Sequence, residues 1–286
     1  MTTLSKHLAF AQRRARLLAR IGDDIAVIPT APEQVRNRDS HHPYRFDSYF
    51  WYLTGFPEPE AVLVLAGGKS ILFCRDKDEE REIWDGFRYG PEAAQLAFGF
   101  DEAYPIASLE ARLPELMADR AGLWHALGHD PVWDACISKA LNAVRAQARA
   151  GKRAPRAIHD LRLELDEMRL VKDAAELDLM ARSADIASAG HARAMAVCRP
   201  GMAEYELEAE LGYEFRRRGA QAHAYNPIVA GGANACILHY VENDKLLAEG
   251  SLVLIDAGCE LDGYAADITR TFPVNGRFSP AQKDCY

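Results

Sequence analysis

The segment that most constrains the fold is residues 252–272, where two apolar runs flank the pair Asp262 and Gly263. An Asp-Gly pair between extended runs is a strong signal for a two-residue β-turn, because both central residues must take positive φ. The segment therefore predicts an antiparallel hairpin in which Leu261 faces Tyr264.

The predicted register brings two acidic side chains together. Counting back from the turn, Asp256 is opposite Thr269 and Gly258 is opposite Asp267. Directly opposed residues share a face, so the two aspartates point to the same side as diagonal neighbours, roughly 7–8 Å apart. Carboxylates in this arrangement can converge on one or two cations, and their oxygens suit hard ions such as Mn²⁺ or Mg²⁺.

The acidic face is also partly apolar, because Asp256 shares it with Leu252 and Leu254. Two carboxylates there repel each other and lose hydration, and a divalent cation removes both penalties. The geometry alone leaves a second interpretation open, in which the acids are solvated or bonded to backbone amides. A one-residue change in the loop would also send the two aspartates to opposite faces.

The pattern of the remaining sequence predicts two units. In the first, strands mix with helices, and the expected elements are strands 25–28, 61–65 and 70–74 and helices 106–119 and 131–148. In the second, two helices precede a run of strands, and the expected elements are helices 172–198 and 203–218 and strands 225–230, 236–241, 251–259 and 264–272. The basic segment 145–156, with its Gly and Pro, is the best candidate for the linker.

Apolar residues at helical spacing mark the expected buried face of each helix in the second unit. In the first helix they are Leu177, Met180, Ala184, Ala187 and Ala194, and in the second they are Leu207, Leu211 and Phe215. Two such helices followed by antiparallel strands predict an α+β layer rather than a parallel sheet.

The composition excludes several classes of protein. The formal net charge is -8, whereas nucleic-acid-binding proteins usually carry a basic field, so no nucleic acid is expected as a partner. No apolar run approaches the length of a membrane span, so no membrane partner is expected either. The six cysteines are scattered without a C-x-x-C pair, which is typical of reduced thiols and predicts a cytoplasmic protein.

The second half of the sequence resembles the metal-site region of the creatinase, aminopeptidase P and prolidase ("pita-bread") peptidases. Ile-Asp-Ala-Gly at 255–258, Tyr264 and Asp-Ile-Thr-Arg-Thr-Phe at 267–272 match the hairpin of that family. Ile-Leu-His-Tyr at 237–240 matches its upstream His-Tyr strand, and Met-Arg-Leu-Val-Lys at 168–172 is similar to the entry to its catalytic domain.

The first half resembles the N-terminal domain of bacterial aminopeptidase P in segments 39–45 and 50–56, the latter reading Phe-Trp-Tyr-Leu-Thr-Gly-Phe. The resemblance covers essentially the whole chain. It implies an α/β creatinase-like N-terminal domain at 1–165 and an α+β pita-bread catalytic domain, incomplete, at 166–286.

The resemblance assigns roles to four residues. Asp256 would bind one metal ion and Asp267 would bridge two, with Mn²⁺ as the expected metal and the remaining family ligands, one histidine and two glutamates, absent from this chain. His239 would be the catalytic histidine that contacts substrate near the scissile carbonyl, and Tyr225 would line the substrate pocket. From the residues alone, His239 also fits a strand histidine bonded to a neighbouring backbone group.

The activity that the resemblance implies is that of an Xaa-Pro aminopeptidase, which cleaves between an N-terminal residue and a following proline with a metal-activated water. The expected partners are peptides with proline in second position, and a homo-oligomer is expected at full length. Two alternatives stay open: an Xaa-Pro dipeptidase of the same fold, and a non-catalytic family member that serves in binding or assembly.

The sequence is expected to be truncated at its C-terminus. Ser279, Pro280 and Gln282 have the pattern of a helix start, and a finished domain seldom ends while it opens a new helix. Two aspartates also offset only half the charge of two divalent ions. The 286 residues alone are therefore expected to bind Mn²⁺ poorly, to be inactive and to aggregate.

Overall fold

The computed structural model describes residues 3–286, and the chain divides into two compact units between Val171 and Lys172. The division does not fall at the expected 165/166 boundary. Helix α7 (Leu161–Leu170) belongs wholly to the first unit, because Leu165 and Met168 are buried in its core.

The first unit is built on a six-stranded mixed sheet in the order β6-β5-β4-β1-β7-β8. The strands are β1 (Ile25–Pro29), β4 (Val62–Ala66), β5 (Lys69–Cys74), β6 (Glu102–Pro105), β7 (Gly122–His125) and β8 (Ala157–Asp160), with a separate small ladder of β2 (Val35–Asn37) and β3 (Ser40–His41). Strand β1 is antiparallel to β4 and parallel to β7. The three strands expected in this half are confirmed.

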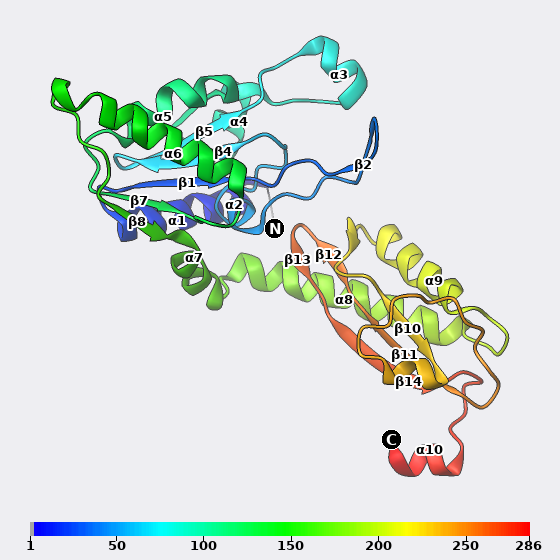
Figure 1. The fold of residues 1–286 in the computed structure, drawn as a ribbon. Coiled ribbons are helices and arrows are strands. Elements are labelled where there is room, and N and C mark those ends of the chain that lie inside the picture. The colour runs from blue at the N-terminus through cyan, green and yellow to red at the C-terminus, as the bar shows by residue number, and fades with distance from the viewer. Residues whose placement is uncertain (1–2) are drawn as a thin grey trace. The chain divides into compact units, whose positions relative to one another are not determined.

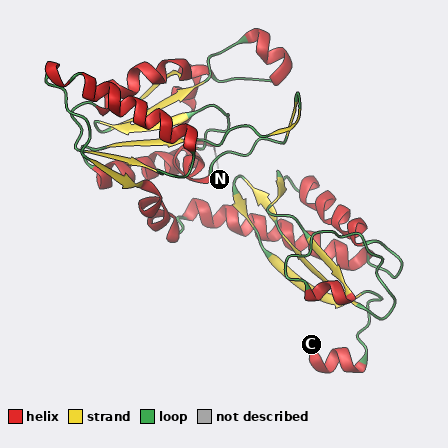
Figure 2. Cartoon of the chain, viewed as in Figure 1, coloured by secondary structure: helices red, strands yellow, loops and turns green. Residues whose placement is uncertain are grey.

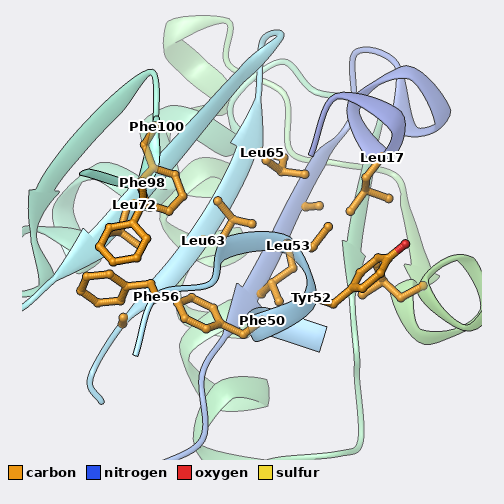
Figure 3. Close-up of a cluster of buried hydrophobic side chains, with 14 of the residues drawn as sticks. Leu17, Phe50, Tyr52, Leu53, Phe56, Leu63, Leu65, Leu72, Phe98 and Phe100 are labelled. Atoms are coloured by element: carbon orange, nitrogen blue, oxygen red, sulfur yellow. The ribbon is translucent and has the colours of Figure 1, made fainter. Parts of the chain in front are cut away.

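Helices cover both faces of this sheet, as Figure 1 shows. One face packs against α1 (Thr3–Ile21), α2 (Ser48–Thr54), α4 (Gly90–Phe98) and α7, and the other against α5 (Leu109–Met117) and α6 (Pro131–Ala146). Alternate strand residues enter opposite cores, because side chains along a strand alternate in direction: Leu63 and Leu65 point to the first face and Val62 and Val64 to the second. Figure 3 shows the aromatic part of the first core, with Phe50, Phe56, Phe98 and Phe100.

The proposed linker at 145–156 is wrong, because this segment lies inside the first unit. It contains the end of α6 and the short 3₁₀ helix η2 (Ala148–Ala150), and it leads into β8, which pairs with β7 in the sheet. The remaining elements of this unit are α3 (Glu79–Asp85) and the 3₁₀ helix η1 (Ile106–Ser108).

The second unit places two helices, α8 (Ala174–Val197) and α9 (Glu204–Arg217), against antiparallel strands (Figures 1 and 2). One sheet has the order β10 (Ile228–Gly231), β11 (Leu252–Ala257), β14 (Ile268–Pro273), and a smaller one has the order β13 (Tyr264–Ala265), β12 (Cys259–Leu261), β9 (Ala222–His223). The 3₁₀ helix η3 (Gly232–Cys236) follows β10, and α10 (Pro280–Cys285) ends the chain. The predicted α+β layer is confirmed.

The buried face of α9 is the predicted one, with Leu207, Leu211 and Phe215 in the core. The prediction for α8 is partly right: Ala187 and Ala194 are buried in the core, whereas Leu177 is exposed and Ile186 and Gly190 are buried instead. The reason is the close approach of α9: a Cβ on Gly190 would lie 2.4 Å from the ring of Phe215. The close approach of α9 at Gly190 therefore helps to decide which side of α8 is buried.

Two of the expected strands are wrong in whole or in part. The segment 225–230 becomes a strand only at Ile228, after Pro227, which has no N–H to donate to a ladder. The segment 236–241 forms no strand: it contains the end of η3 and a turn. Within this segment the side-chain hydroxyl of Tyr240 donates to Glu204, at the start of α9.

Within residues 3–286 there is no helix with the length and apolar character that crossing a bilayer requires.

Candidate metal centre

The predicted hairpin and its register are confirmed. Asp262 and Gly263 take φ values of 49° and 81°, as a two-residue turn with two left-handed positions requires. Leu261 pairs with Tyr264, and further down the same register Asp256 pairs with Thr269.

The two faces of β11 differ in burial. Val253, Ile255 and Ala257 are buried in the core beneath the helices, whereas Leu252, Leu254 and Asp256 form the half-exposed opposite face. Strand alternation therefore places the Asp256 carboxylate on the open side of the sheet.

Asp256 and Asp267 converge on one phenol. The hydroxyl of Tyr225 donates to Asp256 Oδ1 at 2.5 Å and lies 3.0 Å from Asp267 Oδ1. The two carboxylate oxygens therefore lie no farther apart than the sum of those distances. Burial, followed by the hydrogen bonds to the two carboxylates, raises the pKa of Tyr225 well above its ordinary value. The hydroxyl carries one hydrogen, and the shorter of the two distances directs it to Asp256 Oδ1.

Gly258 allows the two aspartates to approach. A Cβ on this residue would lie only 1.6 Å from the carbonyl oxygen of Ala266 and 3.1 Å from the amide nitrogen of Asp267. The backbone of the second strand thus passes directly over Gly258 and delivers Asp267 beside Asp256. A residue with any side chain could not occupy this position without moving that backbone.

His239 is exposed and lies in the turn after η3, not in a strand. No hydrogen bond joins it to Asp256 or Asp267 in the described chain. Its neighbour Tyr240 is buried and donates to Glu204 at 2.7 Å. The structure therefore brings Asp256, Asp267 and Tyr225 together, and it places His239 on a separate, anchored loop.

The sequence analysis missed Glu204. A glutamate in the first turn of a helix is usually a surface residue whose negative charge interacts favourably with the helix dipole. Here it is fully buried, and no signal in the local sequence distinguishes the two cases.

The pair of aspartates fits part of a divalent metal site. Carboxylate oxygens are the ligands that hard divalent cations prefer, and those cations take six or so ligands in proteins. Among the residues that the structure describes, no group of three or more His, Cys, Asp and Glu side chains is placed to hold a metal ion. Asp256 and Asp267 would be two ligands of such a site, and tight binding would require others.

Comparison with known proteins identifies the family of both units. The aminopeptidase P N-terminal domain matches residues 10–124, and metallopeptidase family M24 matches residues 178–286. The Xaa-Pro aminopeptidase of Escherichia coli strain K12 is 45% identical over 283 residues, which cover 97% of this chain and 64% of that protein. The chain belongs to the aminopeptidase P branch of the M24 metallopeptidases.

Solved structures of aminopeptidase P share the fold of both units. An aminopeptidase from Pseudomonas aeruginosa matches with a TM-score of 0.95 and 50% identity, over 97% of this chain and 64% of that one. A substituted Escherichia coli aminopeptidase P, solved in complex with substrate, matches with a TM-score of 0.95 and 44% identity over the same shares. The chain thus spans about two thirds of these relatives, and in the M24 family it carries the N-terminal domain and part of the pita-bread domain.

Tyr225→Phe is expected to lower the unfolding free energy of the second unit by about 1 kcal/mol at pH 7 without added metal, because two carboxylates lose their shared donor. The pKa of Tyr225 is higher in the folded state than in the unfolded state. The tyrosine therefore stabilises the folded state at any pH below its unfolded pKa, and this stabilisation is lost as the pH rises above the unfolded pKa. The difference between the two proteins should therefore shrink above about pH 10. Urea unfolding followed by circular dichroism at pH 7 and pH 10.5 measures it. Exposed Tyr205, changed to Phe, is the control and should show no loss at either pH.

Proposed function

We propose that this chain carries the first metal ligands and the substrate-side histidine of an Xaa-Pro aminopeptidase. The observation that supports the proposal most directly is the convergence of Asp256 and Asp267 on Tyr225 from two strands of one hairpin. A structural role for the pair is a weaker explanation, because two acids facing each other on a half-apolar face are unfavourable without a cation.

In this proposal Asp256 and Asp267 hold divalent cations, most simply Mn²⁺, on the open face of β11. Such ions, when bound, activate a water at neutral pH and stabilise negative charge on the attacked carbonyl. The Tyr225 hydroxyl lies within hydrogen-bond distance of both carboxylates and orients them toward one point. The half-exposed Leu252 and Leu254 lie on the same face of β11 as Asp256.

The substrate in this proposal is a peptide with proline in its second position, and cleavage releases the N-terminal residue. His239 contributes a hydrogen bond on the substrate side, from an exposed position that leaves its ring free to meet a peptide. The imidazole lies on a loop and the acid pair on the hairpin of the same unit, so substrate binding and metal binding can be disrupted separately.

A fusion tests the proposal. The 286 residues are joined to the part of the Escherichia coli relative that lies beyond the match, and the product is called the fusion below. With Mn²⁺ it is expected to release the first residue from X-Pro-Y tripeptides and to leave X-Pro dipeptides uncleaved. The unfused chain should show no metal-dependent cleavage and should bind Mn²⁺ with a Kd of about 1 mM or weaker, because two carboxylates are too few for a tight site.

Chromatography of the released amino acid and calorimetry of Mn²⁺ binding supply the two measurements. A folded fusion that cleaves neither substrate would contradict the proposal. Preference for the X-Pro dipeptide would instead identify a dipeptidase. Micromolar Mn²⁺ binding by the unfused chain would show that its residues form a complete site.

A further inference from the structure

Glu204, the first residue of α9, is fully buried and accepts four hydrogen bonds. Its Oε1 accepts from the Gly231 amide at 2.8 Å and from Asn234 Nδ2 at 2.9 Å. Its Oε2 accepts from the Tyr240 hydroxyl at 2.7 Å and from the Lys245 amide at 3.0 Å. A carboxylate offers about four acceptor positions, so its capacity is fully used.

All four donors belong to one segment, residues 231–245, which begins at the last residue of β10, leads toward β11 and contains His239. The bonds are spread along the segment, with one at its start, one in η3, one beside His239 and one at its end. The backbone adds a fifth connection, since the Glu204 amide donates to the Lys245 carbonyl at 2.9 Å. This segment is called the histidine loop below. Its start, middle and end are thus all held by hydrogen bonds to the carboxylate of Glu204.

A second buried residue fixes the end of the histidine loop. Asn243 takes a left-handed conformation with φ of 48° and is almost fully buried. Its side chain accepts from the Val229 amide at 3.0 Å and donates to the Pro227 carbonyl and to Glu208, each at 2.9 Å. The loop therefore has two anchors, and His239 lies between them, next to Tyr240.

The burial of the Glu204 carboxylate depends on the conformation of the histidine loop, because that loop supplies its hydrogen-bond donors. A buried carboxylate is strongly unfavourable unless hydrogen bonds replace its hydration. Glu214, on the same helix and also buried, is held instead by the guanidinium groups of Arg217 and Arg218. Glu204 is held by amides and a hydroxyl of the histidine loop, so the carboxylate stabilises one conformation of that loop and only that conformation satisfies the carboxylate.

We propose that Glu204 is a positioning residue for His239: its buried carboxylate fixes the conformation of the histidine loop and thereby the place of the imidazole. The proposal rests on the proposed function only for what His239 does with a substrate. The fixing of the loop is a property of the 286-residue chain, and it can be measured without metal, substrate or activity.

Glu204→Gln in the 286-residue chain tests it. The carboxamide has nearly the same shape, but its NH₂ group cannot accept, so two of the four donors lose their partner. Hydrogen exchange of peptides covering 231–245 is expected to become about 100-fold faster. The imidazole signal of His239, identified as the one of nine that His239→Gln removes, is expected to broaden in the carbon-13 spectrum of the histidine rings.

Glu214→Gln is the matched control. It replaces a buried glutamate of the same helix by the same residue and removes the charge that holds Arg217 and Arg218, but no bond of Glu214 reaches the histidine loop. General destabilisation of the unit should appear in both variants, whereas loss of order in the loop and at His239 should appear only in Glu204→Gln. Equal changes in both variants, or no change in Glu204→Gln, would overturn the proposal.

Tyr240→Phe keeps the test decisive if Glu204→Gln fails to fold. It removes one bond to the carboxylate and keeps the ring, and it should raise exchange in the histidine loop about tenfold. Unchanged exchange in this variant would refute the proposal. An inactive fusion with an ordered histidine loop would refute the proposed function and leave the role of Glu204 intact.

Discussion

Asp267→Asn and Asp256→Asn are each expected to lower kcat/KM of the fusion for X-Pro-Y peptides at least about 1,000-fold, which corresponds to about 4 kcal/mol of transition-state stabilisation. Asparagine keeps the shape of the side chain and one oxygen that Tyr225 can bond, so the hairpin should persist. What it lacks is the negative charge that a hard cation requires. The measurement is the initial rate of N-terminal residue release at saturating Mn²⁺.

Asp262→Asn provides the control on the same hairpin. Asp262 occupies a left-handed turn position, which asparagine also tolerates, and its amide and carboxylate both bond to the side chain of Gln221. This variant should retain at least half of the activity. Retention of more than a tenth of the activity in Asp267→Asn would show that the aspartate is not a metal ligand, and an equal loss in Asp262→Asn would show that the hairpin tolerates no change.

The register of the acid pair could be derived from the sequence because every step was local. The Asp-Gly turn set the loop length, and the two-residue period of a strand then fixed which side chains share a face. Three strands of the first sheet, β1, β4 and β5, could also be predicted from the sequence, because each contains a continuous apolar run. Strand β8 was missed because Ala157–Asp160 has little strand character of its own and depends on pairing with β7.

The conformation of the histidine loop could not be derived from the sequence, because it depends on contacts between residues far apart along the chain. Its conformation depends on Glu204, whose nearest donor in the loop lies 27 residues further along the chain. The local sequence at 236–241 favours a strand, and a distant buried acceptor overrides that preference. The roles of Asp256, Asp267, His239 and Tyr225 remain predictions that the fusion and its variants test.

Gly258→Ala is expected to lower the unfolding free energy of the second unit by about 3–5 kcal/mol, a large share of the stability of an ordinary domain. The added methyl group meets the backbone of Ala266, which cannot rotate away as a side chain can. The strand after the turn must shift, and that shift also carries Asp267 away from Asp256 and Tyr225. The variant should therefore lose both the stability of the second unit and the arrangement of Asp256 and Asp267.

The two units offer an internal reference for this measurement. All four tryptophans lie in the first unit, so their fluorescence follows its unfolding in urea, whereas circular dichroism also follows α8 and α9. Gly258→Ala should leave the fluorescence transition in place and move part of the dichroism transition to lower urea. Gly250→Ala is the control, because its φ is 77° but no atom lies within 4 Å of the added Cβ, so only backbone strain of about 1–2 kcal/mol is expected. If the two variants lose the same stability, close backbone contact at Gly258 is not what holds the aspartates together.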